Sequence, residues 1–330
     1  MRIFITGGSG FIGTNAVSAF AAAGHELLNY SAQAPLDSGQ NAWWREGDIL
    51  DQVATTTAIQ EFQPDWALHL AARAECDENT TIEKGYRVNT DGTQNVLQAI
   101  RATPSVQRAI ITSTQFVCGP GRVPQHDEDY FPVTIYGGSK IITEKLTRVA
   151  ELACCWTIVR PTNVWGPWHL RYRREFWRVL QRGLYIHPGR QPVIRSYGYV
   201  KNVVDQMRRI FEAPATQVSE RTLYLGDRPA NLLEWVNGFS RALAGREVRI
   251  VPRPLMKLVA RVGDIPTRLT GRAFLINSSR YRSMITDYDT PMQPTFDLLG
   301  ENPYSLAEGI DETIAWLGSY KGTDRAAGGA

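Results

Sequence analysis

Cysteine is scarce in this chain, with four among 330 residues. Cys76, Cys118, Cys154 and Cys155 follow neither the spacing of a metal site nor that of a disulfide framework. The sequence therefore predicts no metal centre. Because unpaired cysteines are typical of a reducing compartment, we expect a cytoplasmic protein.

Long apolar runs and a strong charge of one sign are also missing. No stretch of about 18 uncharged apolar residues occurs, which predicts no membrane span. Met1-Arg2 leads directly into a strand-like run, so we expect no signal peptide. The formal net charge of +3 is too small to indicate a nucleic-acid-binding protein.

A glycine-rich turn near the N-terminus is the most informative feature present. Residues 5–13 read Ile-Thr-Gly-Gly-Ser-Gly-Phe-Ile-Gly, between a strand-like run and a helix-like stretch. In this arrangement Gly7 allows the turn, Gly10 lets the backbone approach phosphates, and Gly13 lets helix pack on strand. The start of the helix offers free N–H groups to an anion. The turn therefore predicts a dinucleotide site, with an ordinary βα turn as the alternative.

Strand-like and helix-like runs alternate through the first half of the chain. The predicted strands are 2–5, 26–30, 67–70, 108–112 and 156–159, and the predicted helices are 15–23, 90–102 and 135–150. This alternation predicts an α/β fold with a Rossmann-type, doubly wound parallel sheet. The ligand is expected beyond the carboxyl ends of the strands.

The domain organisation is predicted from a change in the sequence after Pro161, where the alternating strand-like and helix-like runs give way to loops and amphipathic helices rich in Arg and aromatic residues. We expect residues 1–160 to form the dinucleotide-binding domain, with 196–226 returning to it through a strand at 222–226. Residues 161–195 and 227–320 are expected to form a smaller, mixed C-terminal substrate lobe with a helix at 232–244. The small, polar residues 321–330 predict a disordered tail.

Basic residues are concentrated in two places. Residues 160–209 hold eleven Lys or Arg against two carboxylates, a net charge of +9. A phosphate-bearing substrate is the favoured explanation, and a solvated helix face or a polyanion or membrane surface are the alternatives. The stretch 255–269 is amphipathic and basic, for which a packed helix is favoured over a membrane-surface helix.

Tyr136 and Lys140 open the helix predicted at 135–150. Residues four apart share one helix face, so the phenol and the ammonium can point at the same spot. A neighbouring cation and the positive nicotinamide ring are expected to lower the pKa of the phenol from its usual value near 10. Tyr136 can then exchange a hydroxyl proton while a hydride moves. Thr114, at the end of a predicted strand, can orient the substrate oxygen.

These motifs, in this order, resemble the extended short-chain dehydrogenase/reductase superfamily, and within it the nucleotide-sugar epimerase/dehydratase group. Besides the glycine turn and the Tyr-x-x-x-Lys pair, the resemblance is carried by 47–49, 69–72, 89–93, 113–119, 160–167, 195–200 and 299–316. It implies that the cofactor is bound by Gly7, Gly10, Phe11, Ile12, Gly13, Ser31, Asp48, Ile49, Leu70, Ala71, Ala72, Asn89, Lys140 and Pro161.

Several of these positions take specific roles from the resemblance. Asp48 is expected to bond the adenine amino group, with a turn residue as the alternative, and Ile49 to line that pocket. Residues 71–72 are expected beside the pyrophosphate, and Asn89 to hold a loop near the cofactor. His69 is expected to be structural.

Other positions are implied to act on the substrate. Thr114, Tyr136 and Lys140 are the implied catalytic residues. Thr114, Asn163 and Arg195 are implied to contact the substrate, Arg195 by pairing with a diphosphate. A cap for Asn163 and a surface ion pair for Arg195 are the alternatives.

Departures from the family pattern narrow the reaction. Sugar 4,6-dehydratases place Asp-Glu after the catalytic Thr, whereas Gln115 and Phe116 stand here, which disfavours dehydration. His169 is one position beyond the place of a second acid and stays a candidate for that role. Cys118 replaces a usual Tyr, for which packing is the only explanation found.

Cofactor choice depends on the end of the second strand, where members that bind NAD usually place an acidic residue. Ser31 stands there instead, which removes repulsion against a 2′-phosphate and offers it a hydroxyl. No Arg or Lys that could pair with a 2′-phosphate follows Ser31 nearby, and Arg45 is distant from it in the sequence. The sequence thus favours NADP marginally over NAD.

The combined prediction is an NAD(P)-dependent enzyme that transfers a hydride at C4 of a nucleotide-linked hexose. A 4-ketoreductase is slightly favoured over a 4-epimerase, because Ser31 replaces an acidic residue. The alternatives are a dehydrogenase of an apolar, sterol- or terpenoid-like alcohol and a non-catalytic, dinucleotide-sensing scaffold. A nucleotide-diphosphate sugar is the expected partner, and a homodimer through 90–102 and 135–150 is expected by analogy.

Overall fold

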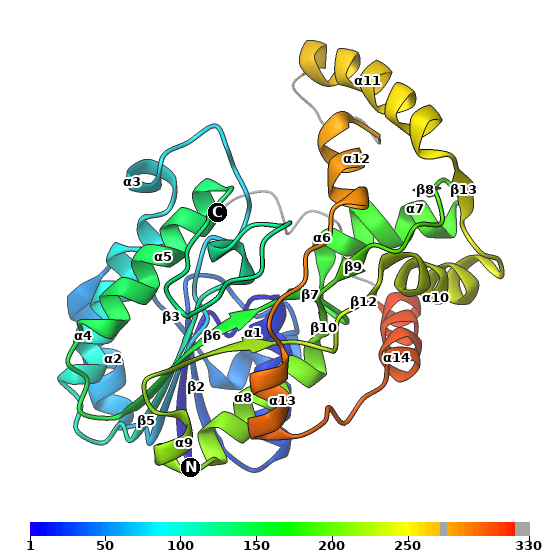
Figure 1. Cartoon of the computed structure of the whole chain (residues 1–330). Coiled ribbons are helices and arrows are strands. Elements are labelled where there is room, and N and C mark those ends of the chain that lie inside the picture. Colours follow the sequence, from blue (N-terminus) through cyan, green and yellow to red (C-terminus); the bar gives the residue numbers. More distant parts are fainter. Residues whose placement is uncertain (271–275, 321–330) are drawn as a thin grey trace.

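Seven parallel strands form one central sheet, in the order β3-β2-β1-β4-β5-β6-β11 (Figure 1). The computed structural model of the chain describes residues 1–270 and 276–320, without the side chains of 266–270, so the tail predicted at 321–330 lies outside the described residues. The strands are β1 (Arg2–Thr6), β2 (Glu26–Ser31), β3 (Trp44–Glu46), β4 (Trp66–His69), β5 (Arg108–Thr112), β6 (Cys155–Pro161) and β11 (Arg221–Leu225). The predicted doubly wound parallel sheet is confirmed.

Helices cover both faces of this sheet. One face carries α1 (Phe11–Ala22) and α8 (Val200–Glu212), and the other carries α2 (Gln52–Phe62), α4 (Asp91–Arg101) and α5 (Ile135–Arg148). Alternate residues of β1 serve the two layers: Ile3 and Ile5 pack with α1, and Phe4 packs with α2 and α4. The strand order reverses between β1 and β4, where an open parallel sheet binds its ligand.

The first helix begins earlier than its prediction at 15–23. Gly10 is its N-cap, and the Thr14 backbone N–H donates to the Gly10 carbonyl (2.8 Å). The glycine run therefore continues directly into α1 at Phe11. This brings the helix N-terminus against the glycine turn, where a phosphate can reach it.

The remaining elements are short strand pairs and helices. The strands are β7 (Asn163–Trp165), β8 (Ile186–Pro188), β9 (Ile194–Arg195), β10 (Tyr197–Tyr199), β12 (Ala230–Asn231) and β13 (Arg249–Val251), paired as β7–β10, β9–β12 and β8–β13. The helices are α3 (Ile82–Gly85), α6 (Leu170–Tyr172), α7 (Arg178–Gln181), α9 (Ala215–Val218), α10 (Leu232–Ala244), α11 (Arg253–Thr270), α12 (Ser278–Ile285), α13 (Gln293–Leu299) and α14 (Leu306–Ser319).

Aromatic side chains pack together among these remaining elements. The Trp165 and Trp235 rings lie 5.1 Å and 4.9 Å from the Phe239 ring, and Tyr197 stacks on Trp235 at 4.2 Å. These rings come from β7, α10 and β10 and belong to the core cluster that also contains Ile3 and Ile5 of β1.

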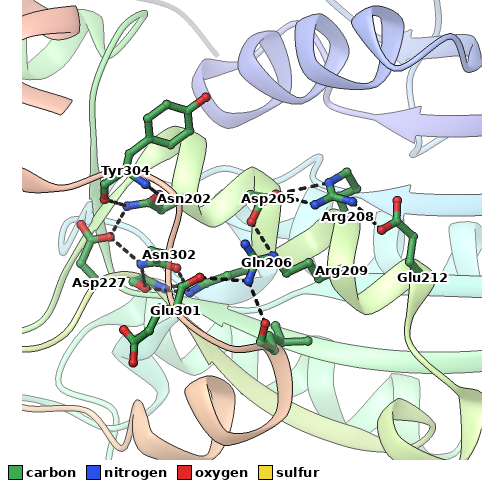
Figure 2. A network of polar contacts seen from close by, with 12 residues as sticks. Asn202, Asp205, Gln206, Arg208, Arg209, Glu212, Asp227, Glu301, Asn302 and Tyr304 are labelled. Atoms are coloured by element: carbon green, nitrogen blue, oxygen red, sulfur yellow. Dashed lines mark hydrogen bonds and ion pairs between the residues drawn. The ribbon is translucent and has the colours of Figure 1, made fainter. Parts of the chain in front are cut away.

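Polar side chains of α8 hold the C-terminal segment against the sheet domain (Figure 2). Asn202 Nδ2 donates to the Asp227 carboxylate (2.7 Å) and to the Tyr304 carbonyl (2.8 Å). Gln206 Nε2 donates to the side-chain oxygen of Asn302 (2.8 Å). Since this segment leads into α14, which packs on α10, the network ties the two lobes together.

The basic amphipathic stretch predicted at 255–269 is observed as α11. It packs on α12 through buried Met256 and Ala260, while Leu258 and Val262 on the same helix are exposed. The sequence favoured a packed helix, and this prediction is correct only for the side of α11 that packs on α12. No helix of the described residues is long and apolar enough to cross a bilayer.

Candidate active site

The glycine turn after β1 packs closely against the end of β4. Gly7 has a φ of +72°, which favours glycine, and a Cβ on it would lie 2.6 Å from the Ala71 backbone nitrogen. A Cβ on Gly13 would lie 2.3 Å from the Gly7 carbonyl oxygen. A Cβ on Gly10 would have that same oxygen as its nearest neighbour, at 3.4 Å. The turn thus has no space for a side chain at Gly7 or Gly13, whereas a Cβ on Gly10 makes only an ordinary contact.

This open position suits the pyrophosphate of a dinucleotide. The backbone N–H groups of Phe11, Ile12 and Gly13 lie in the first turn of α1, where they have no acceptor within the helix. The helix dipole adds a partial positive charge there. Leu70 N donates to the Thr6 carbonyl (3.0 Å), which aligns the chain after β4 beside the turn. The residues present therefore fit the cofactor that the sequence predicts.

Ser31 lies at the end of β2, but its hydroxyl is turned into the protein. Its Oγ donates to Asn29 Oδ1 (2.7 Å) and accepts from the Ser9 backbone N–H (3.3 Å). Arg45, the basic residue considered from the sequence, pairs with Glu61 (2.7 Å). Neither Ser31 nor Arg45 is thus directed at a 2′-phosphate.

Asp48 and Ile49 follow β3 and differ in exposure. Asp48 is exposed, and its Oδ1 accepts from the Leu50 backbone N–H (2.9 Å), so it does stabilise a turn. The other carboxylate oxygen of Asp48 has no hydrogen bond within the described residues. Ile49 is buried against Gly92 at the start of α4.

Asn89 holds the loop after β4 to the catalytic helix. Its Oδ1 accepts from the Arg73 backbone N–H (2.8 Å), and its Nδ2 donates to the Arg73 carbonyl (3.0 Å) and to Ser139 Oγ (2.9 Å). This contact connects the chain that follows Ala71 and Ala72 with α5. It matches the loop-holding geometry expected for Asn89.

His69 lies within the core. Its ring nitrogens hydrogen-bond the hydroxyls of Thr6 (2.7 Å) and Thr93 (3.1 Å). Burial, together with nearby Lys140, lowers the pKa of His69 to about 3, so the ring is neutral at physiological pH. This is the geometry of a structural histidine that bridges β1 and α4.

Three buried side chains meet at the start of α5. Thr114 follows β5, and its side chain lies near the Tyr136 phenol. Tyr136 and Lys140 lie one turn apart on α5, whose N-cap Thr134 accepts from the Gly137 backbone N–H (2.9 Å). The cap fixes where the helix begins, and so where the phenol and the ammonium emerge.

The pKa expected for Tyr136 requires a correction. Burial raises the pKa of its phenol, and the hydrogen bond from Thr114 opposes that rise. Lys140 is not a cause of the shift, so the expected lowering by Lys140 is wrong for the protein alone. Burial lowers the pKa of Lys140 to about 8, against the attraction of Glu144. The lowered phenol pKa that the sequence predicts would therefore have to come from a positive nicotinamide ring beside it.

A buried ion pair beneath α5 was missed by the sequence reasoning. Glu144 Oε1 accepts from Ser113 Oγ (2.6 Å) and from Arg160 Nε (2.8 Å). Glu144 Oε2 accepts from Arg160 Nη2 (2.8 Å) and from the Tyr130 hydroxyl (3.0 Å). The pair joins α5 to β5 and β6. Its sequence signal is the position of Glu144 four residues after Lys140, on the same face of the helix.

Arg195 has a buried Nε without a hydrogen-bond partner among the described residues. Its Nη1 donates to the carbonyls of Ser283 (2.9 Å) and Thr286 (3.2 Å), and its guanidinium lies over the Tyr288 ring (5.7 Å). Its Nε is buried and has no hydrogen-bond partner. Arg195 forms no ion pair within the described residues, so the surface ion pair considered from the sequence is not observed.

Tyr288 connects Arg195 with the catalytic residues. Its hydroxyl donates to the carbonyls of Gln115 (2.9 Å) and Cys118 (2.8 Å). The Phe116 ring lies 5.9 Å from the Tyr288 ring and 6.1 Å from the Tyr136 ring. Arg195 and Tyr136 are thus linked through the packed rings of Tyr288 and Phe116. The Cys118 thiol is buried in this packing.

Pro161 and Asn163 lie at the carboxyl end of β6. Pro161 ends the strand, and Asn163 opens β7 two residues later. The Asn163 side chain is half-buried, and its amide makes no hydrogen bond to the part of the chain that the structure describes. No capping role is seen for it there.

His169 is a cap rather than an acid. Its Nδ1 accepts from the Tyr172 backbone N–H (3.1 Å), and its ring stacks on Tyr172 at 4.1 Å and lies 4.5 Å from the Phe11 ring. Burial lowers the pKa of His169 to about 3. A neutral, capped imidazole does not donate a proton at physiological pH, so the structure gives no support to His169 as a second acid.

The basic segment 160–209 is divided among several environments. Arg160 is used in the buried ion pair, and Arg208 pairs with Asp205 (2.8 Å). Arg195 keeps a buried donor unpaired. Arg195 therefore stays a candidate for the phosphate-binding interpretation of the segment.

Comparison with known proteins gives a consistent result. The NAD dependent epimerase/dehydratase family matches residues 3–226. An Escherichia coli O157:H7 N-acetyl-alpha-D-glucosaminyl-diphospho-ditrans,octacis-undecaprenol 4-epimerase is 27% identical, over 96% of this chain and 95% of its own. A 3-beta-hydroxysteroid dehydrogenase of Mycolicibacterium neoaurum is 26% identical, over 71% of this chain and 68% of its own.

Solved structures agree with the fold. The Thermus thermophilus UDP-glucose 4-epimerase in complex with NAD superposes with a TM-score of 0.70 at 20% identity, over 97% of this chain and 99% of that chain. The sheet, the glycine turn and the Thr-Tyr-Lys arrangement thus occur together in one family match that covers most of the chain. The chain belongs to the NAD dependent epimerase/dehydratase family, a family of enzymes of the extended short-chain dehydrogenase/reductase type.

Proposed function

We propose that this enzyme inverts C4 of a hexose carried on a diphosphate, by removing and returning a hydride at that carbon. The observation that carries the proposal is the buried Tyr136 phenol, with Thr114 near it and the buried Lys140 one turn away on α5. Thr114 and Tyr136 hold the C4 oxygen, and Tyr136 takes its proton as the carbonyl forms. Lys140 keeps a positive charge beside them. NAD, when bound at the glycine turn, supplies the hydride acceptor and donor.

NAD is proposed rather than NADP. The marginal preference for NADP depended on Ser31 meeting a 2′-phosphate, and its hydroxyl instead bonds Asn29 and Ser9. The family is described as NAD dependent, and the Thermus thermophilus structure contains NAD. The preference for a ketoreductase also depended on Ser31, and it loses its support for the same reason.

Epimerisation is supported over dehydration by the residues after Thr114. Gln115 and Phe116 carry no acid or base there, so elimination of water has no proton donor at that place. The Escherichia coli relative and the Thermus thermophilus structure are both named 4-epimerases. The scaffold alternative has no support, because the family is one of enzymes.

A nucleoside diphosphate is the first proposed carrier, with Arg195 Nε as the donor to its phosphates. A polyprenyl diphosphate is a second candidate, because an apolar groove of about 200 Å³ begins beside Arg195. Ser283, whose carbonyl accepts from Arg195, lines this groove together with Phe176, Val179, Leu184, Ile186 and Met284. The full-length relative from Escherichia coli acts on a substrate of that second kind by name.

A sterol-like alcohol is less well supported. The steroid dehydrogenase relative matches a smaller share of this chain than the Escherichia coli relative does. A neutral alcohol also leaves Arg195 Nε buried and unpaired, which is costly. A homodimer through α4 and α5 stays a prediction.

The proposal is tested by incubating the full chain and NAD with UDP-glucose, UDP-N-acetylglucosamine and N-acetylglucosaminyl-diphospho-undecaprenol, and by assigning the C4 configuration of the products. We expect interconversion of C4 epimers without net consumption of cofactor. Tyr136→Phe is expected to lower turnover by about 10²–10⁴-fold, since it removes the proton acceptor, and to leave NAD binding intact.

Tyr304→Phe is the matched control, because Tyr304 lies in the C-terminal network and its hydroxyl makes no hydrogen bond to the described residues. It is expected to keep full turnover. Stoichiometric oxidation of NADPH by a 4-keto sugar, without interconversion of epimers, would establish a reductase instead.

A further inference from the structure

Helix α11 presents three distinct longitudinal faces. At about 3.6 residues per turn, its described side chains fall into a buried, a basic and an apolar exposed stripe. The buried stripe contains Met256, Ala260 and Gly263. The basic stripe contains Arg253, Lys257 and Arg261, and the exposed apolar stripe contains Leu255, Leu258, Val259, Val262 and Ile265. The three stripes follow one another around the helix axis.

The buried stripe is used by α12. Asp264 accepts from the backbone N–H (2.9 Å) and the hydroxyl (2.6 Å) of Ser278, and the Tyr281 hydroxyl donates to the Arg253 carbonyl (3.3 Å). Figure 1 shows α11 at the outer end of the second lobe, with α12 beside it. α11 is therefore anchored to the protein along one side.

The exposed stripe is unusually apolar for a surface. Its five side chains are between 41% and 59% exposed, and they form a continuous run over three turns. Lys257 and Arg261 flank it and form no ion pair within the described residues. Asp264 is the only carboxylate among residues 253–265, and it is engaged by Ser278. The outward surface thus combines apolar side chains with uncompensated positive charge.

The apolar groove beside Arg195 is lined in part by the neighbouring helix α12. Met284 and Ser283 of α12 line the groove, and the Ser283 carbonyl accepts from Arg195. α12 therefore contributes to the groove and also packs on α11.

We propose that α11 is a membrane-docking helix, which lies in the interface of an anionic phospholipid bilayer. Its apolar stripe enters the acyl boundary, and Lys257 and Arg261 contact the lipid phosphates. A second copy of the chain fits less well, because an isologous contact brings the same basic stripes together. The inference holds for either proposed sugar carrier, so it stands apart from the assignment of the reaction.

The test is co-sedimentation of the full chain with vesicles of phosphatidylcholine and phosphatidylglycerol at a 7:3 ratio, and with phosphatidylcholine alone. We expect binding to the anionic vesicles, at least tenfold weaker binding to the neutral ones, and weakening by 0.5 M salt. Leu258→Glu together with Val262→Glu is expected to reduce the apparent affinity at least tenfold. Val53→Glu together with Val149→Glu, which changes exposed valines on the sheet domain, is the matched control and is expected to bind as the original chain does.

Turnover of UDP-sugars by both variants reports folding and the active site independently of docking. Equal vesicle binding by the Leu258→Glu, Val262→Glu variant and its control would overturn the proposal, as would failure of the unmodified chain to bind anionic vesicles. If sedimentation velocity shows instead that this variant dissociates a dimer, the stripe is a contact between copies and the proposal is wrong.

Discussion

At the scale of single residues, burial acts in opposite directions on two groups that lie one helical turn apart. It raises the pKa of the Tyr136 phenol and lowers that of the Lys140 ammonium to about 8. Both shifts have the same cause, which is that a charged form loses hydration inside the protein. The ionised form of Tyr136 is therefore disfavoured in the protein alone, and a positive charge beside the phenol would favour it.

The pKa of Lys140 leads to a prediction about cofactor affinity. The ammonium is retained below about pH 8 and is lost as the pH rises through that value. A hydrogen bond to a charged group contributes about 1.5–3 kcal/mol, so we expect NAD to bind about tenfold more weakly at pH 9.5 than at pH 7. Titration calorimetry at a series of pH values measures this.

Lys140→Arg is the control for that titration, because guanidinium keeps its charge over the whole range. Its affinity for NAD is expected to be flat between pH 7 and 9.5. An equal loss of affinity in Lys140→Arg and in the unmodified chain would show that another group titrates.

The proposed catalytic residues could be selected from the sequence, whereas the residues that support them could not. Thr114, Tyr136 and Lys140 are separated by fixed spacings that the sequence displays directly. The inward turn of Ser31 depends on the Asn29 side chain and on the Ser9 backbone N–H, which Ser31 meets only in the folded protein. The same holds for Glu144 of α5, whose partner Arg160 lies on β6.

At the scale of elements, the glycine turn and α1 behave as one unit. Gly13→Ala would place a methyl group 2.3 Å from the Gly7 carbonyl oxygen, which is backbone and cannot move aside cheaply. Overpacking of this kind costs about 1–3 kcal/mol. We expect a lower midpoint of thermal unfolding and weaker binding of NAD.

Gly318→Ala, in α14, is the matched control, since its added Cβ has no neighbour within 4 Å. Alanine in a helix is favoured over glycine by up to about 1 kcal/mol, so the unfolding midpoint is expected to stay or rise. Equal midpoints and NAD affinities for the two variants would contradict the close packing at Gly13.

Elements with a clear hydrophobic period were predictable, and those without one were missed. β5 and α10 have the predicted bounds, because apolar residues and turn signals delimit them. α2 was missed, since three consecutive threonines interrupt its pattern with β-branched side chains. α11 was predicted as a helix, but the sequence favoured packing for a face that the structure leaves exposed.

At the scale of the whole molecule, side-chain contacts hold the C-terminal elements to the sheet domain. α8 and Asp227 tie the C-terminal segment to the sheet domain (Figure 2), and Tyr288 ties the Arg195 region to the loop after β5. The doubly wound sheet was predictable from alternation of strand and helix. The arrangement of the second lobe was not, because it depends on contacts between residues about a hundred positions apart, such as Asn202 with Tyr304.

The central claim is that a hydride leaves and returns to C4 while Tyr136 handles the hydroxyl proton alone. It is tested most directly with a substrate that carries deuterium at C4, converted in ordinary water and analysed by mass spectrometry and NMR. The account predicts that the epimerised product keeps its deuterium at C4, because a hydride held within the site does not exchange with solvent. Replacement of that deuterium by hydrogen from water would contradict it.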